Sequence, residues 1–369
     1  MNLSYWEIKS WFTNVDFTII GSGIVGLSTA LSLKEKYSKA NILVLEKGIL
    51  PEGASTKNAG FACFGSLSEI IDDLKSHSEE EVMQLVKKRW DGLNLLRSNL
   101  GDKTIDYQQY GGYELFYDND DILEECMQKR VEVNRLLKPL FNKEIYSITE
   151  NIFSFKRVHN KYIYNPFEGQ IDTGKMMVSL LQKVQTKGIK ILSNCFVEKF
   201  EESNNKANIK TNIGEFKTDK LFITTNGFAK QFINDDIQPA RAQVLITKPI
   251  KNLSIKGTFH LDKGYYYFRN IDNRILFGGA RNLDFITEET VKFGLTDKVQ
   301  NRLEAFLSDT ILPTTDFEIE HRWSGIMGVG NQKQPIVKQL SENVFCGVRL
   351  GGMGIAIGSK IGKELADLV

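Results

Sequence analysis

The first fifty residues combine short apolar runs with one segment of helical periodicity. Residues 17–20 (Phe-Thr-Ile-Ile) form an apolar run that leads into a glycine-rich turn over 21–26. Apolar side chains then recur at helical spacing over 27–36, and a second apolar run over 41–46 ends in Glu46. The order strand, glycine turn, helix and strand predicts a βαβ unit at this end of the chain.

Both periodicities recur later in the chain. Apolar positions at helical spacing predict helices over 67–99, 119–138, 172–187, 291–307 and 357–368. Period-two alternation and short apolar runs between polar turns predict strands over 112–117, 189–223 and 240–285, and just before a last glycine-rich turn at 351–354. The pattern contains no internal repeat and no low-complexity linker.

Composition narrows the class of protein. The 369 residues are 41% hydrophobic and 25% charged, which is ordinary for a globular protein. Lys and Arg number 47 and Asp and Glu 46, so the formal net charge of +1 gives no basic footprint for nucleic acid. No apolar stretch is long enough for a transmembrane segment, and the N-terminus lacks the pattern of a signal peptide. The four cysteines are widely spaced without a CxxC pair, which favours a cytoplasmic protein over a disulfide scaffold.

The turn after the first predicted strand has the spacing of a dinucleotide-binding motif. Gly21, Gly23 and Gly26 form GxGxxG between a strand and a helix, and Glu46 follows at the end of the next strand. Glycines there permit a tight turn and a close approach of the backbone to a pyrophosphate, and the helix N-terminus offers free N–H groups. A carboxylate at Glu46 would accept hydrogen bonds from a ribose diol. The combination predicts dinucleotide binding.

Two other loops are candidates for a cofactor site. GASTKNAG over 53–60 is small and polar, and GGMG over 351–354 opens the last helix, so both could bring backbone N–H groups together. A flexible surface loop and an ordinary strand-to-helix turn are the alternative interpretations. The four histidines show no HxxxH spacing and no cysteine partner, so we predict no metal site. A GxSxG motif is absent, so the sequence offers no nucleophilic serine for the catalytic triad of a hydrolase.

An ordered set of segments runs through nearly the whole chain: GSGIVGLSTAL, VLEKG, GASTKNAG, PFEGQIDTGKMMVSLLQ, FITTNGFA, YYYFR, FGGARN, RWSGIMG and GGMGIAIGSKIGKELA. This set resembles the FAD-dependent oxidoreductases of the D-amino-acid oxidase superfamily, in the sarcosine and glycine oxidase branch. The resemblance implies an α/β fold with a Rossmann-like FAD-binding domain made of 1–100, 165–235 and 320–369. An interleaved, sheet-rich α+β substrate domain would comprise 101–164 and 236–319.

The resemblance also implies which residues contact FAD. Gly21, Gly23 and Gly26 would hold the pyrophosphate, Glu46 the ribose, and the backbone of Val197 the adenine. The full expected set is Gly21, Gly23, Ile24, Gly26, Glu46, Lys47, Ser55, Thr56, Ala59, Gly60, Val197, Gly227, Gly352, Gly354 and Ile355. Relatives with covalent flavin use a cysteine before the C-terminal turn. No cysteine lies between Trp323 and Asn343, so the resemblance implies non-covalent FAD.

The chain departs from its relatives where they bind substrate. The two basic positions that they use to hold a substrate carboxylate are Met327 and Ala356 here. Lys263 is close to the place of their oxygen-facing lysine, but it is displaced by one residue, which in a strand would reverse its face. We expect Tyr266 as the first pocket residue and Arg241 as the substitute for the missing basic residues. Core packing of the tyrosine run 265–267 and a structural ion pair of Arg241 are the alternatives.

The sequence therefore predicts an FAD-dependent enzyme that oxidises a C–N bond of a small amine or amino acid by hydride transfer to flavin N5. The electron acceptor, oxygen or a quinone or other carrier, stays open. A first alternative is a 2-hydroxy-acid dehydrogenase of the same superfamily, whose signature would be an Arg/His pair near the flavin. A second, from another class, is a non-catalytic dinucleotide-binding module.

Overall fold

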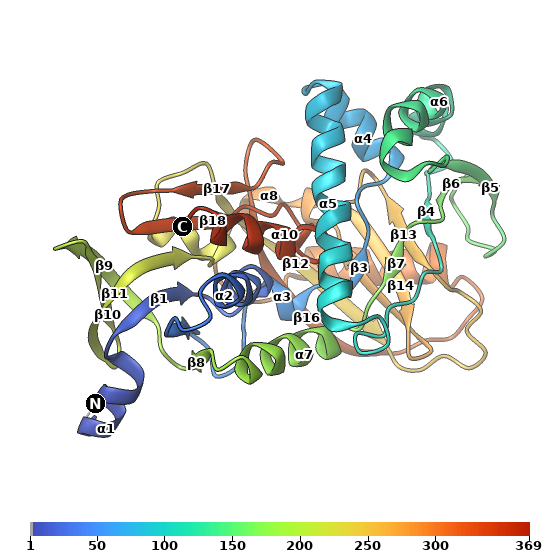
Figure 1. Cartoon of the computed structure of the whole chain (residues 1–369). Coiled ribbons are helices and arrows are strands. Elements are labelled where there is room, and N and C mark those ends of the chain that lie inside the picture. Colours follow the sequence, from blue (N-terminus) through green and yellow to red (C-terminus); the bar gives the residue numbers. More distant parts are fainter. Residues whose placement is uncertain (1–2) are drawn as a thin grey trace.

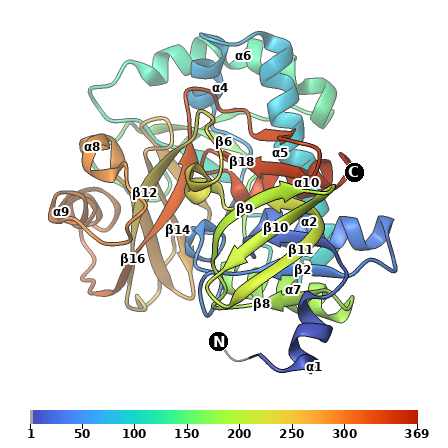
Figure 2. The same ribbon diagram turned by 90° about the vertical axis from the view of Figure 1, so that its left-hand side faces the viewer.

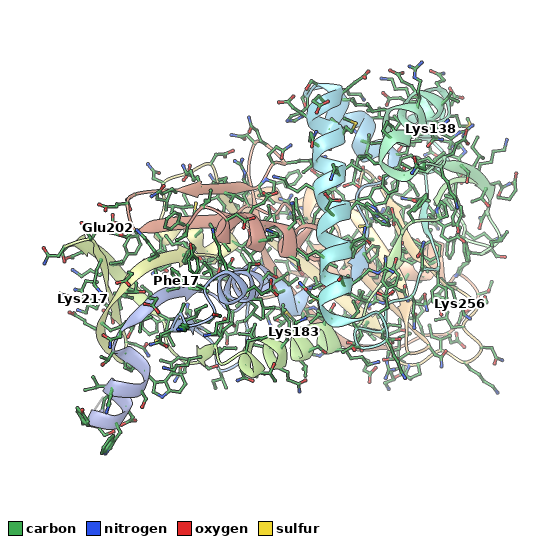
Figure 3. All side chains as sticks on the ribbon, in the orientation of Figure 1. Phe17, Lys138, Lys183, Glu202, Lys217 and Lys256 are labelled. Atoms are coloured by element: carbon green, nitrogen blue, oxygen red, sulfur yellow. The ribbon has the colours of Figure 1, made fainter. Side chains whose placement is uncertain are left out.

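The computed structural model describes residues 3–369 (Figure 1). Two large β-sheets form the body of the protein, and segments far apart in the sequence build each of them. Among the described residues, no helix has the length and apolar character to cross a membrane. Figure 3 shows Lys138, Lys217 and Lys256 on the outside of the molecule, whereas Phe17 lies within the first sheet.

The first sheet has its centre at the predicted βαβ unit, which the structure confirms. Strand β1 (Val15–Ile20) pairs in parallel with β2 (Ile42–Leu45) on one side and β11 (Gly214–Ile223) on the other. The outer strands are β8 (Lys190–Leu192) beside β2, and β18 (Val344–Val348) and β17 (Ile336–Gln339) beyond β11. A hairpin of β9 (Val197–Ser203) and β10 (Lys206–Thr211) pairs with the start of β11 (Figure 2).

Helices cover this sheet because its central strands are apolar on both faces. Helix α2 (Ile24–Lys36) follows β1, and α10 (Gly354–Ala366) packs between α2 and the long α5 (Glu79–Leu100). Helix α7 (Thr173–Thr186) contacts α2 from the other side. Gly362 and Gly358 of α10 permit this close packing, since a Cβ on Gly362 would lie 2.5 Å from the Cβ of Ser28.

The second sheet is mainly antiparallel, in the order β16-β12-β15-β14-β13-β4-β6-β5. Its central strands are β12 (Gln238–Thr247), β15 (Arg274–Gly279), β14 (Tyr266–Ile271) and β13 (Thr258–Leu261). Its outer strands are β16 (Ile319–Val329), β4 (Gly112–Glu114), β6 (Lys161–Asn165) and β5 (Ser147–Glu150). Helix α9 (Asp297–Phe306) covers one face (Figure 2), where Phe259, Phe268, Phe277 and Phe306 form a core.

Smaller elements complete the fold. Helices α4 (Leu67–Leu74) and α6 (Ile122–Phe141) pack together at one end of the molecule (Figure 1). The short helical elements are α1 (Tyr5–Glu7), α3 (Ala54–Lys57), α8 (Phe285–Glu288), two π-helical turns (Ile8–Phe12, Leu307–Ile311) and two 3₁₀ turns (Asn226–Gln231, Arg281–Leu283). Strands β3 (Phe61–Ala62) and β7 (Gly169–Gln170) form a two-stranded ribbon.

Several expected boundaries differ from the structure. The single helix expected over 67–99 is two helices, because Ser78 and Glu81 form a capping box that starts α5 anew. Pro139 lies inside α6, whose last residue is Phe141, and the capping residue Asn142 has a left-handed backbone. The helix expected from 291 begins at Asp297. Strand β16 pairs with β12 along its length, so the boundary expected at 320 falls inside the second sheet.

Candidate functional site

A cavity of about 930 Å³ lies between the two sheets, and residues of both line it. This volume is at the upper end of the range for small-molecule and cofactor sites. One end is lined by the turn between β1 and α2, by Glu46 and by Val197. The other end is lined by β3 and by the face of the second sheet opposite α9, so the cavity is continuous from a dinucleotide-binding turn to a separate chamber.

The glycine turn has the geometry that a dinucleotide requires. Gly21 adopts a φ of +102°, which favours glycine, and a Cβ on Gly23 would lie 2.8 Å from Oγ of Ser55. A Cβ on Gly26 would lie 2.0 Å from the carbonyl oxygen of Gly21, so only glycine lets α2 pack this closely on the turn. The first two glycines line the cavity, and the third packs helix against strand.

Glu46 is held at the cavity wall by a set of hydrogen bonds. Its Oε2 accepts bonds from the backbone N–H (3.1 Å) and hydroxyl (2.6 Å) of Ser22, and its Oε1 accepts one from the N–H of Gly48 (3.0 Å). The carboxylate is buried and lies at the end of β2, one strand from the glycine turn. These contacts fix its position beside the turn, where a ribose would lie.

Most residues expected to contact the cofactor line the cavity. Those that do are Gly21, Gly23, Ile24, Glu46, Lys47, Ser55, Ala59, Val197, Gly352, Gly354 and Ile355. Those that do not are Gly26, Thr56, Gly60 and Gly227. The last three make local structural contacts instead.

The hydroxyl of Thr56 donates to the carbonyls of Pro51 (2.8 Å) and Gly53 (3.0 Å) within its own loop. A Cβ on Gly60, which has a φ of +77°, would lie 2.4 Å from the carbonyl oxygen of Ile171. A Cβ on Gly227 would lie 2.5 Å from the carbonyl oxygen of Met327. Gly60 and Gly227 therefore permit close packing behind the cavity, whereas Thr56 stabilises its own loop. None of the three lines the cavity.

The residues present fit FAD. The N-terminal ends of two helices, α2 and α10, reach the cavity through Ile24 and Gly354, and each offers backbone N–H groups and a partial positive charge. Ser55 already accepts a hydrogen bond from the N–H of Ile24 (3.0 Å), which ties the 53–60 loop to the glycine turn. The cradle thus combines the glycine turn, a carboxylate and a second helix end.

The chamber at the second sheet is aromatic. Phe61 and Tyr267 meet edge to face with ring centroids 5.6 Å apart, and Tyr265 lies two residues before Tyr267 on the same face. The ring of Tyr267 lies across Gly278, where a Cβ would be 2.6 Å from the ring. Met327 and Ala356, at the two places where relatives carry a basic residue, also line the cavity. The chamber therefore lacks a charge at both positions.

The two residues that the sequence suggested for the pocket lie elsewhere. Strand alternation is as expected, but Tyr265 and Tyr267 face the cavity and Tyr266 faces the core, where its ring stacks on Phe306 (5.6 Å). Arg241 points away from the cavity, in a buried ion pair with Glu288 at 2.7 Å. Neither Tyr266 nor Arg241 therefore lines the substrate end of the cavity.

A His–Glu pair in the chamber was not expected from the sequence. His260, on β13, lines the cavity, and its Nε2 lies 2.8 Å from Oε2 of Glu168. Burial alone lowers the pKa of His260, but the charge and hydrogen bond of Glu168, with Glu69 and Glu114 nearby, outweigh it and raise the pKa to about 9. His260 is therefore an imidazolium at neutral pH. The two residues are 92 positions apart, so no local spacing could have indicated the pair.

Cys63 lies beside this pair. The possible ligand atoms of Cys63, Glu168 and His260 all lie within 4.8 Å of one another. Burial raises the pKa of the Cys63 thiol well above its usual value, so the group is neutral at physiological pH. The Nε2 atom of His260 is already hydrogen-bonded to Glu168.

Lys263 lies in the turn between β13 and β14, with a left-handed φ of +52°. Because it is in a turn, strand alternation does not decide its direction, and its side chain lines the cavity. Its Nζ lies 2.8 Å from Oδ1 of Asp72 on α4, and this hydrogen bond raises the pKa of the lysine. The cation is therefore paired with an acid at the cavity wall.

Comparisons with known proteins agree with this architecture. The family model described as FAD dependent oxidoreductase (DAO) matches residues 16–368. A probable oxidoreductase, OrdL, of Haemophilus influenzae is 21% identical over 96% of this chain and 83% of its own length. The crystal structure of L-proline dehydrogenase from P. horikoshii has a TM-score of 0.76 at 19% identity, with 96% of this chain and 93% of that chain covered.

The crystal structure of glycine oxidase from Geobacillus kaustophilus has a TM-score of 0.75 at 17% identity, with 96% of this chain and 94% of that chain covered. At these identities the structural likeness shows the fold, and the expected α/β architecture with a second, sheet-rich part is confirmed. The family model covers nearly all of the sequence. The chain therefore belongs to the DAO family of FAD-dependent oxidoreductases.

Proposed function

We propose that this enzyme oxidises a C–N bond of a small amine or amino acid, with non-covalently bound FAD as its cofactor. The observation that carries the proposal is the continuity of the cavity. It joins the glycine turn and Glu46 to an aromatic chamber lined by Phe61, Tyr265 and Tyr267. When bound, FAD supplies an acceptor for the hydride, and the protein residues bind and orient the substrate.

The chamber suits an amine that enters in its neutral form. A neutral amine that loses a hydride from the adjacent carbon becomes an iminium ion, which water converts to a carbonyl compound and a protonated amine. No protein base is needed to remove the hydride. His260, the histidine of the chamber, is held as an imidazolium by Glu168, so it is a hydrogen-bond donor at neutral pH.

Aromatic rings favour the same class of substrate. Phe61, Tyr265 and Tyr267 provide apolar area for alkyl groups, and aromatic ring faces attract the positive charge that develops on nitrogen as the hydride leaves. The two structural neighbours named above are described as acting on proline and on glycine. Their names support an amine or amino acid as the substrate class.

A second candidate, 2-hydroxy-acid oxidation, is favoured by one observation. The cavity contains both an arginine and a histidine, Arg281 and His260, which is the pair expected for that reaction. An alcohol that loses a hydride must also lose its hydroxyl proton, and this requires a base. Because Glu168 keeps His260 protonated, the pair favours amine oxidation at neutral pH.

The test is anaerobic reduction of the bound flavin by a substrate panel. The panel contains glycine, sarcosine, proline, D-alanine, a series of N-alkylamines and several 2-hydroxy acids, and bleaching of the flavin absorbance reports reduction. We expect bleaching by an amine or amino acid and none by the hydroxy acids. Bleaching by hydroxy acids alone would replace the proposal with the second candidate.

A further inference from the structure

The guanidinium group of Arg281 lines the chamber without a polar partner. Among residues 3–369 it forms no ion pair and donates no side-chain hydrogen bond. Other half-buried or buried arginines of this region do have such partners. The partners are the Phe64 carbonyl for Arg89, Glu288 for Arg241, the Ile171 carbonyl for Arg269 and Asp236 for Arg349.

Aromatic packing fixes the position of Arg281. Its guanidinium carbon lies 4.8 Å from the ring centroid of Phe285, and the ring of Phe285 packs at 5.8 Å against Tyr265. A cation–π contact of this kind uses none of the N–H donors of the guanidinium, which stay available to a ligand. Only Ala280, which has a left-handed φ of +59°, separates Arg281 from the end of β15.

Two phenol groups lie in the same part of the cavity. Burial lowers the pKa of Arg281, whereas the nearby Tyr265 and Tyr267 act to raise it. Neither tyrosine hydroxyl has a hydrogen-bond partner among residues 3–369. Gly278 leaves room for the ring of Tyr267 beside β15. Arg281, Tyr265 and Tyr267 therefore offer three donor groups without partners to the same cavity.

We propose that Arg281, with Tyr265 and Tyr267, binds a carboxylate of the substrate. The fork of a guanidinium matches the two oxygens of a carboxylate, and a half-buried cation without a counter-ion is favourably neutralised by an anionic ligand. The substrate is then an amino acid or N-substituted amino acid, and not a simple alkylamine. This inference rests on the proposed function and specifies the substrate class of the same site.

Other cations of the cavity are placed less well for this role. Lys263 is neutralised by Asp72, and His260 by Glu168. The ammonium group of Lys57 lies over the ring of Phe293, at 5.2 Å from its centroid, and Lys292 is exposed at the surface. Lys333 is paired with Asp73, and Lys47 is exposed. Among the cavity-lining residues that the structure describes, Arg281 alone combines a fixed position, a planar fork and two neighbouring phenols.

The experiment compares holoenzyme of the wild type with Arg281→Met and Arg281→Lys. Arg135→Met is the matched control, because Arg135 is an exposed arginine on α6. Acetate and benzoate are titrated into the oxidised holoenzyme, and the change in flavin absorbance gives their dissociation constants without any turnover. The same proteins are then reduced anaerobically with proline, sarcosine, their methyl esters and N-alkylamines.

We expect Arg281→Met to weaken acetate and benzoate binding roughly 100-fold, which corresponds to the loss of charge-assisted hydrogen bonds. Arg281→Lys should recover part of the affinity, and the control should match the wild type. Flavin reduction by the free amino acid should need a much higher concentration in Arg281→Met, whereas reduction by the ester should change little.

Equal carboxylate affinity in wild type and Arg281→Met would overturn the inference while leaving amine oxidation intact. Loss of FAD affinity in Arg281→Met would also overturn it, because the arginine would then contact the cofactor. A wild type that no amine or amino acid reduces would refute the proposed function, and the acetate and benzoate titrations would still test Arg281.

Discussion

Arg241 and Glu288 form a buried ion pair, in which the guanidinium donates two hydrogen bonds to the carboxylate at 2.7 and 2.9 Å. Gln243 donates to the same carboxylate at 2.9 Å, so Glu288 is the centre of a network between β12 and α8. The positive charge of Arg241 is therefore neutralised by Glu288 within the protein. Arg241 is therefore a structural residue, whereas Arg281 lines the cavity and has no polar side-chain partner among the described residues.

We predict that Arg241→Met destabilises the protein by roughly 3–5 kcal/mol, since it leaves the carboxylate of Glu288 buried and unpaired. The double variant Arg241→Met/Glu288→Met should recover most of the loss. Urea unfolding of the three proteins measures the free energies. If Arg241→Met is as stable as the wild type but binds acetate more weakly, Arg241 contributes to the substrate site and is not a structural residue.

Glu46→Gln should weaken FAD binding by roughly ten- to a hundred-fold, since a hydrogen bond to a charged group contributes about 1.5–3 kcal/mol. The amide keeps the size of the side chain but loses one acceptor oxygen near Ser22 and the expected ribose. Titration of the apo-protein with FAD measures the constant. The control is Glu198→Gln, because Glu198 is an exposed carboxylate on β9. If Glu46→Gln binds FAD as tightly as this control and the wild type, the expected ribose contact is wrong.

Sequence reasoning was most successful where a local pattern determines the structure. The GxGxxG turn, the helix after it and Glu46 are specified within thirty residues, and the structure has them as expected. Strand alternation correctly separated Tyr266 from its neighbours. The sequence alone could not say which face met the cavity, because that depends on α9 covering the other side.

The substrate end depends on contacts between distant segments. Glu168, just before β7, meets His260 of β13 only through the tertiary fold. Likewise, Glu288 reaches Arg241 from a short helix 47 residues away. No local sequence pattern distinguishes Arg281 from Arg241 or Arg349. Only the partners of each guanidinium distinguish them, and those partners are fixed by tertiary structure.

The His260–Glu168 pair predicts a loss of stability at alkaline pH. The pKa of His260 is raised in the folded protein to about 9, from an ordinary value near 6.5. Its contribution is therefore fully present below about pH 6.5 and is lost as the pH rises through about 9. The free energy of unfolding should fall over this window by up to roughly 3 kcal/mol more in the wild type than in His260→Gln. Urea unfolding at a series of pH values measures both; parallel curves would contradict the pair.

FAD should be released by acid precipitation and colour the supernatant. The two cysteines that line the cavity, Cys63 and Cys195, both have a pKa raised chiefly by burial, so neither is the thiolate that an attachment to flavin requires. Absorbance of supernatant and pellet measures the fraction released. A yellow pellet would show covalent attachment, and Cys63→Ser and Cys195→Ser would then identify the linked residue.

Gly278→Ala tests whether Tyr267 acts through its position. The backbone of Gly278 is not left-handed, so alanine is tolerated there, but its Cβ would lie 2.6 Å from the ring of Tyr267 and must displace it. Tyr267→Phe keeps the ring and removes only the hydroxyl. We expect Tyr267→Phe to weaken acetate binding roughly ten-fold, as for one lost hydrogen bond to a charged group, and Gly278→Ala to weaken it at least as much. Melting temperatures separate this effect from unfolding. If Gly278→Ala binds acetate as tightly as the wild type, the ring of Tyr267 does not contribute to the carboxylate site, and Arg281 would act with Tyr265 alone.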